Sequence, residues 1–129
     1  MLPPCVAGTR ATGRLQGRGM IVRTWRGHTE SSRQHLYPDH FKRTVLPELK
    51  VIEGFVGASL SSQQQGAEVE FMVLTRWTSM DAIRAFAGED VDKAVVEPAA
   101  MAALTSYDRT VCHYTVLDEI GWVNFEVPE

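Results

Sequence analysis

The stretch VEFMVLT, which begins at Val69, constrains the fold more than any other part of the chain. Its β-branched and aromatic residues predict a β-strand, in which successive side chains point to opposite faces. Val69, Phe71 and Val73 share one face, and Met72 and Leu74 share the other. Because both faces are apolar, a sheet that contains this strand has to be covered on both sides.

Strand and helix patterns alternate in a definite order along the chain. Strands are predicted at 20–27, 53–60, 69–75 and 109–117, and helices from Ser31 to about Glu48, after Ser79, and from Pro98 to about Leu104. The order β-α-β-β-α-β is typical of a ferredoxin-like split β-α-β sandwich, an α+β fold with an antiparallel four-stranded sheet. Helices cover only one face of such a sheet, so the second apolar face predicts a homodimer packed sheet to sheet.

Local signals mark the ends of these elements. Ser31 followed by Gln34 has the spacing of a capping box, and Pro38 is expected to kink the first helix or restart it in a new turn. Ser79 is expected to cap the next helix and Gly88 to stop it. The polar stretch SQQQGAE predicts a turn between the second and third strands.

The length of 129 residues suits one domain. Residues 1–19 lack a hydrophobic period and the apolar run of a secretory signal, so we expect a disordered N-terminal extension before a domain at 20–118. Residues 119–129 form a tail, and its Trp122 and Phe125 are expected to pack on another part of the protein.

Charge and cysteine content argue against several classes of function. Residues 1–19 carry three Arg and no acidic residue, so the remainder holds the other 10 basic residues and all 16 acidic ones. An acidic body without a basic stripe argues against a nucleic-acid partner, and no stretch is apolar for long enough to span a membrane. Cys5 and Cys112 suit a reducing cytoplasm, and no histidines have metal-ligand spacing.

Four stretches carry a resemblance to a known family. They are MIVRTWRG near the start, LPELKVIEGFVGASL after the first helix, EFMVLTRWTSMDAIRAFAG at 70–88, and VCHYTVLDE near the end. Together they resemble the antibiotic biosynthesis monooxygenase domain family over about residues 20–118. The resemblance implies a dimeric α+β barrel with a pocket between helices and sheet in each subunit. Members include cofactor-independent monooxygenases of quinol-like molecules, haem-degrading enzymes and small isomerases.

The resemblance distinguishes between branches of this family. Haem-degrading members have a Trp and a haem-ligating His at the positions of Phe86 and Val96, and because valine cannot ligate iron, haem degradation is disfavoured. Quinol-oxidising members have a Trp at the end of the third strand, which Trp77 matches, and an Asn where this chain has Val73. The implied activity is cofactor-independent oxidation of a small aromatic or quinol-like substrate by molecular oxygen.

His113 and Arg23 are the candidate catalytic residues. His113 lies in the middle of the fourth predicted strand, where an ionisable group is expected to be paired or used. It is either a base that deprotonates a phenol or enol, or a hydrogen-bonded structural histidine. Arg23 shares a strand face with Trp25, and it either stabilises the substrate anion or forms a salt bridge across the dimer.

The remaining candidates are expected to line the pocket. Trp77, at a strand-to-helix junction, is expected to pack near Ile83 and Phe86 as a wedge that also walls the pocket. The predicted pocket residues are Trp25, Tyr37, His40, Phe41, Trp77 and Phe86. No flavin, nicotinamide or phosphate-binding motif is present, so no cofactor is predicted. An isomerase, or a non-catalytic small-molecule-binding or stress-response module, are the alternatives on the same fold.

Overall fold

The strand order expected from the sequence is present in the computed structural model, which describes residues 20–119. The strands are β1 (Ile21–Glu30), β2 (Phe55–Gln65), β3 (Glu68–Trp77), β4 (Ser106–Tyr107) and β5 (Cys112–Thr115). They form one antiparallel sheet in the order β2-β3-β1-β4, and β5 pairs with β1 further along the same edge. This order confirms the α+β, ferredoxin-like fold. The predictions for residues 1–19, and for the tail beyond residue 119, lie outside the described residues.

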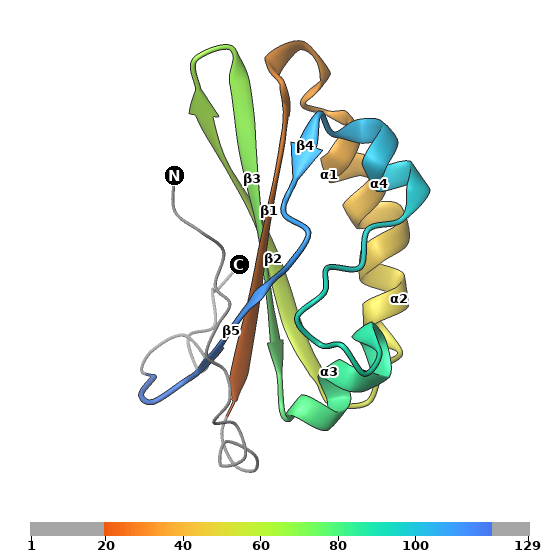
Figure 1. Ribbon diagram of the computed structural model, residues 1–129, viewed down its shortest axis with the longest axis vertical. Helices are drawn as coiled ribbons and strands as arrows, with labels where there is room; N and C mark the ends of the chain where they lie inside the picture. The colour runs from red at the N-terminus through yellow and green to blue at the C-terminus, as the bar shows by residue number, and fades with distance from the viewer. Residues whose placement is uncertain (1–19, 120–129) are drawn as a thin grey trace, which may run out of the picture.

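The helices all lie on one face of the sheet (Figure 1). They are the 3-10 turn η2 (Ser31–Arg33), α1 (Leu36–His40), the π-helical turn η3 (Phe41–Val45), α2 (Leu46–Lys50), α3 (Met80–Ala87) and α4 (Pro98–Ala103). The segment at 88–97, which we call the strap, runs from α3 to α4 on this side of the sheet (Figure 1).

The first helical segment is less regular than the sequence predicts. The capping box is absent, because Gln34 Nε2 donates to the backbone oxygen of Ser31 instead of the two residues capping each other. Pro38 lies in the first turn of α1, where a missing N–H is tolerated. The π-type bond from Leu46 N–H to the Phe41 carbonyl comes directly before Pro47, whose ring would clash with a carbonyl in a regular α-helical turn.

The last predicted strand is also corrected, because β-structure at 109–117 is limited to β5 and follows a break after β4. Between the two strands, Asp108 N–H still donates to the Arg26 carbonyl of β1 at 3.0 Å, and the backbone that follows pairs with the strap. Ala94 N–H donates to the Arg109 carbonyl at 2.9 Å, and Val111 N–H donates to the Asp92 carbonyl at 2.9 Å. The stretch from Arg109 to Val111 therefore ties the strap to the edge of the sheet.

The β2–β3 hairpin is tighter than the predicted turn. Its polar residues remain in the strands up to Gln65 and from Glu68, and Gly66, with a φ of 64°, and Ala67 make the turn. Glycine suits this position because a positive φ is strained for residues with a Cβ.

Trp77 has the packing role that its position suggests. It is 0 % exposed, its ring stacks on Phe86 with centroids 5.7 Å apart, and it meets Phe55 edge to face at 5.4 Å. Its Nε1 donates to Thr75 Oγ1 at 2.8 Å. The helix that follows is capped as predicted, since Ser79 Oγ accepts from Ala82 N–H at 3.1 Å. Trp77 is thus a wedge between the sheet and α3.

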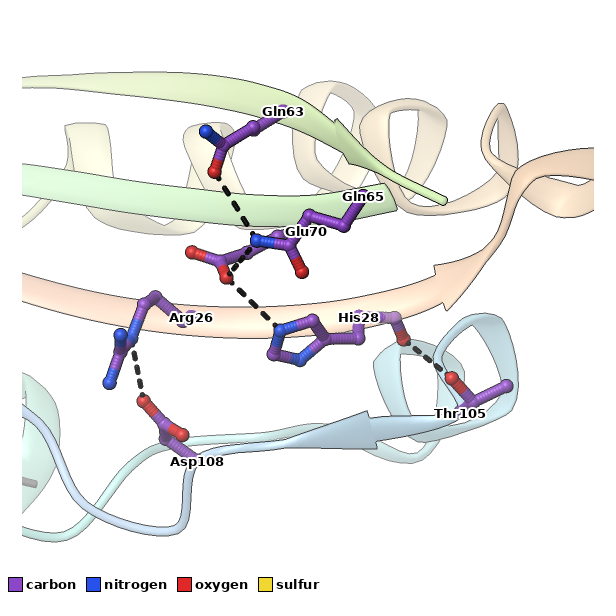
Figure 2. A network of polar contacts seen from close by, with 7 residues as sticks. All are labelled: Arg26, His28, Gln63, Gln65, Glu70, Thr105 and Asp108. Carbon is purple, nitrogen blue, oxygen red and sulfur yellow. Dashed lines mark hydrogen bonds and ion pairs between the residues drawn. The ribbon is translucent and has the colours of Figure 1, made fainter. Parts of the chain in front are cut away.

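The sheet face opposite the helices, which we call the open face, is lined by the even-numbered residues of β1 and β3. Met72 and Leu74 lie there half-buried, as the alternation predicts, while odd-numbered β3 residues face the core. Figure 2 shows the polar end of this face, where His28 and Glu70 pair at 3.2 Å and Gln65 donates to Glu70 at 3.0 Å. No helix among the described residues covers this face (Figure 1).

Candidate functional site

A cavity of about 70 Å³ lies between the helices and the sheet. Five of the residues predicted from the sequence line it: Arg23, Trp25, Tyr37, His40 and Phe86. The remaining lining residues are Val45, Glu48, Leu49, Val73, Thr75, Val95, Glu97, Ala100 and Val111. Val95 is 45 % exposed and the Glu97 side chain 33 % exposed, so the cavity reaches solvent beside the strap and the start of α4.

Three predicted site residues, Phe41, Trp77 and His113, lie outside this lining. Phe41 and Trp77 are buried in two separate core clusters and do not line the cavity. Trp77 lies behind Phe86, which stacks on it and faces the cavity. His113 is also outside the lining, and it contacts Arg23 instead.

Arg23 places a buried cation in the wall of the cavity. The residue is 5 % exposed, and its guanidinium carbon lies 5.6 Å from the centroid of the Phe86 ring. Its Nη1 donates to the Val91 carbonyl at 2.8 Å, and Nη2 donates to the Lys93 carbonyl at 3.2 Å. Desolvation by burial lowers the pKa of Arg23 to about 10, an effect that Asp92 partly opposes. The side chain remains charged at neutral pH and holds the strap.

His113 is a partner of Arg23. The two residues face each other across the β1–β5 pair, and Nη1 of Arg23 is 3.0 Å from Nε2 of His113. Since arginine can only donate, Nε2 is the acceptor. Nδ1 faces Asp92 Oδ1 at 3.5 Å. Burial and the Arg23 charge lower the pKa of His113 to about 4, although Asp92 raises it. Both ring nitrogens are therefore engaged, which speaks against His113 as the base.

An aromatic wall lies along one side of the cavity. Tyr37 and Trp25 have ring centroids 5.8 Å apart, and Tyr37 and His40 lie 5.9 Å apart. Trp25 Nε1 donates to the Asp108 carbonyl at 2.8 Å, which fixes the indole. Burial, and secondarily Glu97, raise the pKa of Tyr37, so its hydroxyl stays protonated at neutral pH.

Two acidic residues of the site were not predicted from the sequence. Glu48 of α2 and Glu97, which precedes α4, both line the cavity, and Glu97 Oε1 is 3.4 Å from His40 Nε2. Burial and a hydrogen bond to Glu48 raise the pKa of Glu97, and His40 lowers it. His40 and Glu48 lie about two helical turns apart, a spacing that by itself predicts no contact between them.

Two negative findings apply to the described part of the chain. Within residues 20–119, no group of three or more His, Cys, Asp or Glu side chains is placed to hold a metal ion. No helix in the same range is long and apolar enough to cross a bilayer.

Comparison with protein-family models and with curated protein sequences finds no match. Solved structures do match. A Bacillus cereus protein assigned to the antibiotic biosynthesis monooxygenases has a TM-score of 0.56 and 17% identity, covering 79% of this chain and 97% of its own. A dimeric ferredoxin-like protein from an uncultured marine organism has a TM-score of 0.62 and 14% identity, covering 80% of this chain and 100% of its own.

A third similar structure is SnoaB, a cofactor-independent oxygenase from Streptomyces nogalater. It has a TM-score of 0.55 and 16% identity, with coverage of 80% of this chain and 98% of its own. The chain has the fold of these proteins. The resemblance found in the sequence is thus confirmed at the level of the fold, which by itself assigns no activity.

Proposed function

We propose that the protein binds a small hydroxy-aromatic or quinol-like molecule in this cavity and oxidises it with molecular oxygen without a cofactor. The observation that carries the proposal is Arg23, a buried cation beside aromatic rings. Among the described residues no carboxylate is hydrogen-bonded to its guanidinium. A phenolate or enolate ligand supplies the missing negative charge. SnoaB and the Bacillus cereus protein add support by sharing the fold.

The chemistry requires only the ligand, a base and oxygen. The base removes a proton, and the substrate carbon of the resulting anion adds to O₂, which accepts the electrons and becomes a carbon-bound peroxide. After protonation, the O–O bond breaks, the carbon loses its remaining hydrogen as a proton to become a carbonyl, and the other oxygen leaves as water. Arg23 stabilises the first anion, which is the role of a preorganised donor in a water-poor site. The substrate itself is the reductant.

The size of the cavity argues against a polycyclic ligand, and even a one-ring ligand requires the cavity to widen. Its volume of about 70 Å³ is smaller than the engineered cavity of about 150 Å³ that takes up benzene. Widening is easiest beside Val95, where the cavity reaches solvent next to the strap. The strap is held there by the Arg23 bonds to Val91 and Lys93, so ligand entry and strap position are linked.

The first test is oxygen consumption by metal-free protein with a panel of hydroquinones and other one-ring phenols. Arg23→Gln removes the cation, and substrate-dependent oxygen uptake is expected to fall roughly 100-fold or more. Arg26→Gln is the matched control, because Arg26 lies on the same strand and pairs with Asp108 at 3.2 Å on the open face. Uptake no faster than the uncatalysed rate on every compound would contradict the oxygenase proposal.

A non-catalytic binding module is the second candidate, because Arg23 already holds two strap carbonyls and so has a structural task. Such a module would bind the same phenols without consuming oxygen. An isomerase would consume none either, but it would release a rearranged product. Haem degradation is not proposed, since Val96 stands where the resemblance would require a haem-ligating histidine.

We also infer that two copies pair through the open face. Its half-buried Met72 and Leu74 leave apolar surface that a second sheet would cover. Light scattering is expected to give about twice the chain mass of 14.4 kDa. Leu74→Glu should shift the protein to monomer, whereas Val51→Glu, at a position 82 % exposed on the helix side, should not. A monomeric wild type would contradict this pairing.

A further inference from the structure

His40 has a buried nitrogen without a hydrogen bond. Its side chain is 9 % exposed and lines the cavity. Nε2 is fully buried and, among residues 20–119, has no hydrogen-bond partner. The nearest charged atom is Glu97 Oε1 at 3.4 Å, an ion-pair distance but not a hydrogen bond. An orphaned polar atom of this kind is costly in a folded protein, which indicates that a ligand group satisfies it.

Glu97 and Glu48 line the same cavity as His40. Burial and the neighbouring Glu48 raise the pKa of Glu97, and His40 lowers it. Glu97, whose side chain is 33 % exposed, lies at the solvent-reaching side of the cavity. A proton that arrives on His40 Nε2 places the new imidazolium 3.4 Å from Glu97 Oε1.

We propose that His40 is the catalytic proton acceptor of the cavity, acting on the O–H or acidic C–H group of a hydroxy-aromatic ligand. In this step the O–H or C–H bond breaks, its electron pair stays on the ligand, and the proton forms a bond to Nε2. Glu97 is the positioning residue for the imidazolium, and Arg23 lines the same cavity to receive the anion. Each new charge then has an opposite charge beside it, so the transfer separates no unpaired charges. The inference rests on the proposed function and names the base that it needs.

The test follows the ionisation of a bound probe, which does not depend on turnover. The probe is 4-nitrophenol, whose phenolate absorbs visible light. A pH titration of the protein–probe complex, followed by this absorbance, gives the pH at which half of the bound probe is ionised. His40→Gln keeps a polar group but cannot take up the proton, and the half-ionisation pH is expected to rise by about 1 to 3 units. His40 contacts Tyr37 and Glu97, and the other ionisable groups that line the cavity are Glu48 and Arg23.

His28→Gln is the matched control, because it removes a second His–Glu pair, with Glu70 at 3.2 Å, on the open face (Figure 2). It should leave the bound probe unchanged. If His40→Gln does not fold, Glu97→Gln, with its side chain 33 % exposed, provides the same test with a smaller upward shift. A probe that binds but ionises alike in wild type and His40→Gln would overturn the role of His40 and leave the proposed binding intact. A wild type that binds no probe would overturn both.

Discussion

Replacing Trp77 with alanine is expected to lower the free energy of unfolding by about 3 to 5 kcal/mol. The indole is fully buried between Phe86 and Phe55, so its removal leaves a cavity as well as the lost transfer energy. Thr75 Oγ1 also loses its donor, the indole Nε1. The lost stability should affect both β3 and α3, because Trp77 of β3 packs in the same buried cluster as Ile83 of α3.

The measurement is urea unfolding at one fixed protein concentration, since the stability of the proposed dimer would depend on concentration. Trp77→Phe, which keeps an aromatic ring at this position, should cost distinctly less than alanine. If Trp77 walled the ligand site instead, Trp77→Phe would weaken phenol binding more than it destabilises the fold. A loss of less than about 1 kcal/mol in Trp77→Ala would contradict the wedge role.

The sheet could be predicted because strand alternation is a local property of the sequence. The apolar residues of β3 fall on two faces, and both faces are found where the alternation places them. The fourth strand could not be predicted in full, because the β-branched run from Arg109 offers its backbone to two partners. The first part of this run forms backbone hydrogen bonds with Ala94 and Asp92 of the strap, and only the part from Cys112 onward pairs with β1.

The site was less predictable than the sheet, because its contacts are between elements that lie far apart in the sequence. Arg23 and Trp25 were identified by strand parity, and both line the cavity. Glu48 and Glu97 carry no local signal of a site, because their contact depends on how α2 approaches the start of α4. His113 was noticed for its mid-strand position, but only the register with Arg23 shows that its Nε2 is already occupied.

Acid is expected to destabilise the protein through His113. Its pKa is lowered from 6.5 to about 4 in the folded state, mainly by burial and secondarily by Arg23. Between these two pH values the unfolded chain binds more protons than the folded one, so stability falls as the pH falls from about 6.5 to 4. The contribution is fully present at pH 7, and the loss reaches at most about 3 kcal/mol below pH 4.

His113→Gln isolates this effect, because its amide oxygen can still accept from Arg23 Nη1 but does not titrate. The difference between the urea midpoints at pH 7 and pH 4.5 should be smaller in this variant than in the wild type. His35→Gln, which removes an exposed histidine, is the control and should keep the wild-type difference. The same variant tests the assignment of the base. If His113 only supports Arg23, oxygen uptake should survive in His113→Gln and be lost in His40→Gln. Equal acid sensitivity of the wild type and His113→Gln would mean that the imidazole is already charged in the folded protein. That result would remove its role as the neutral acceptor for Arg23.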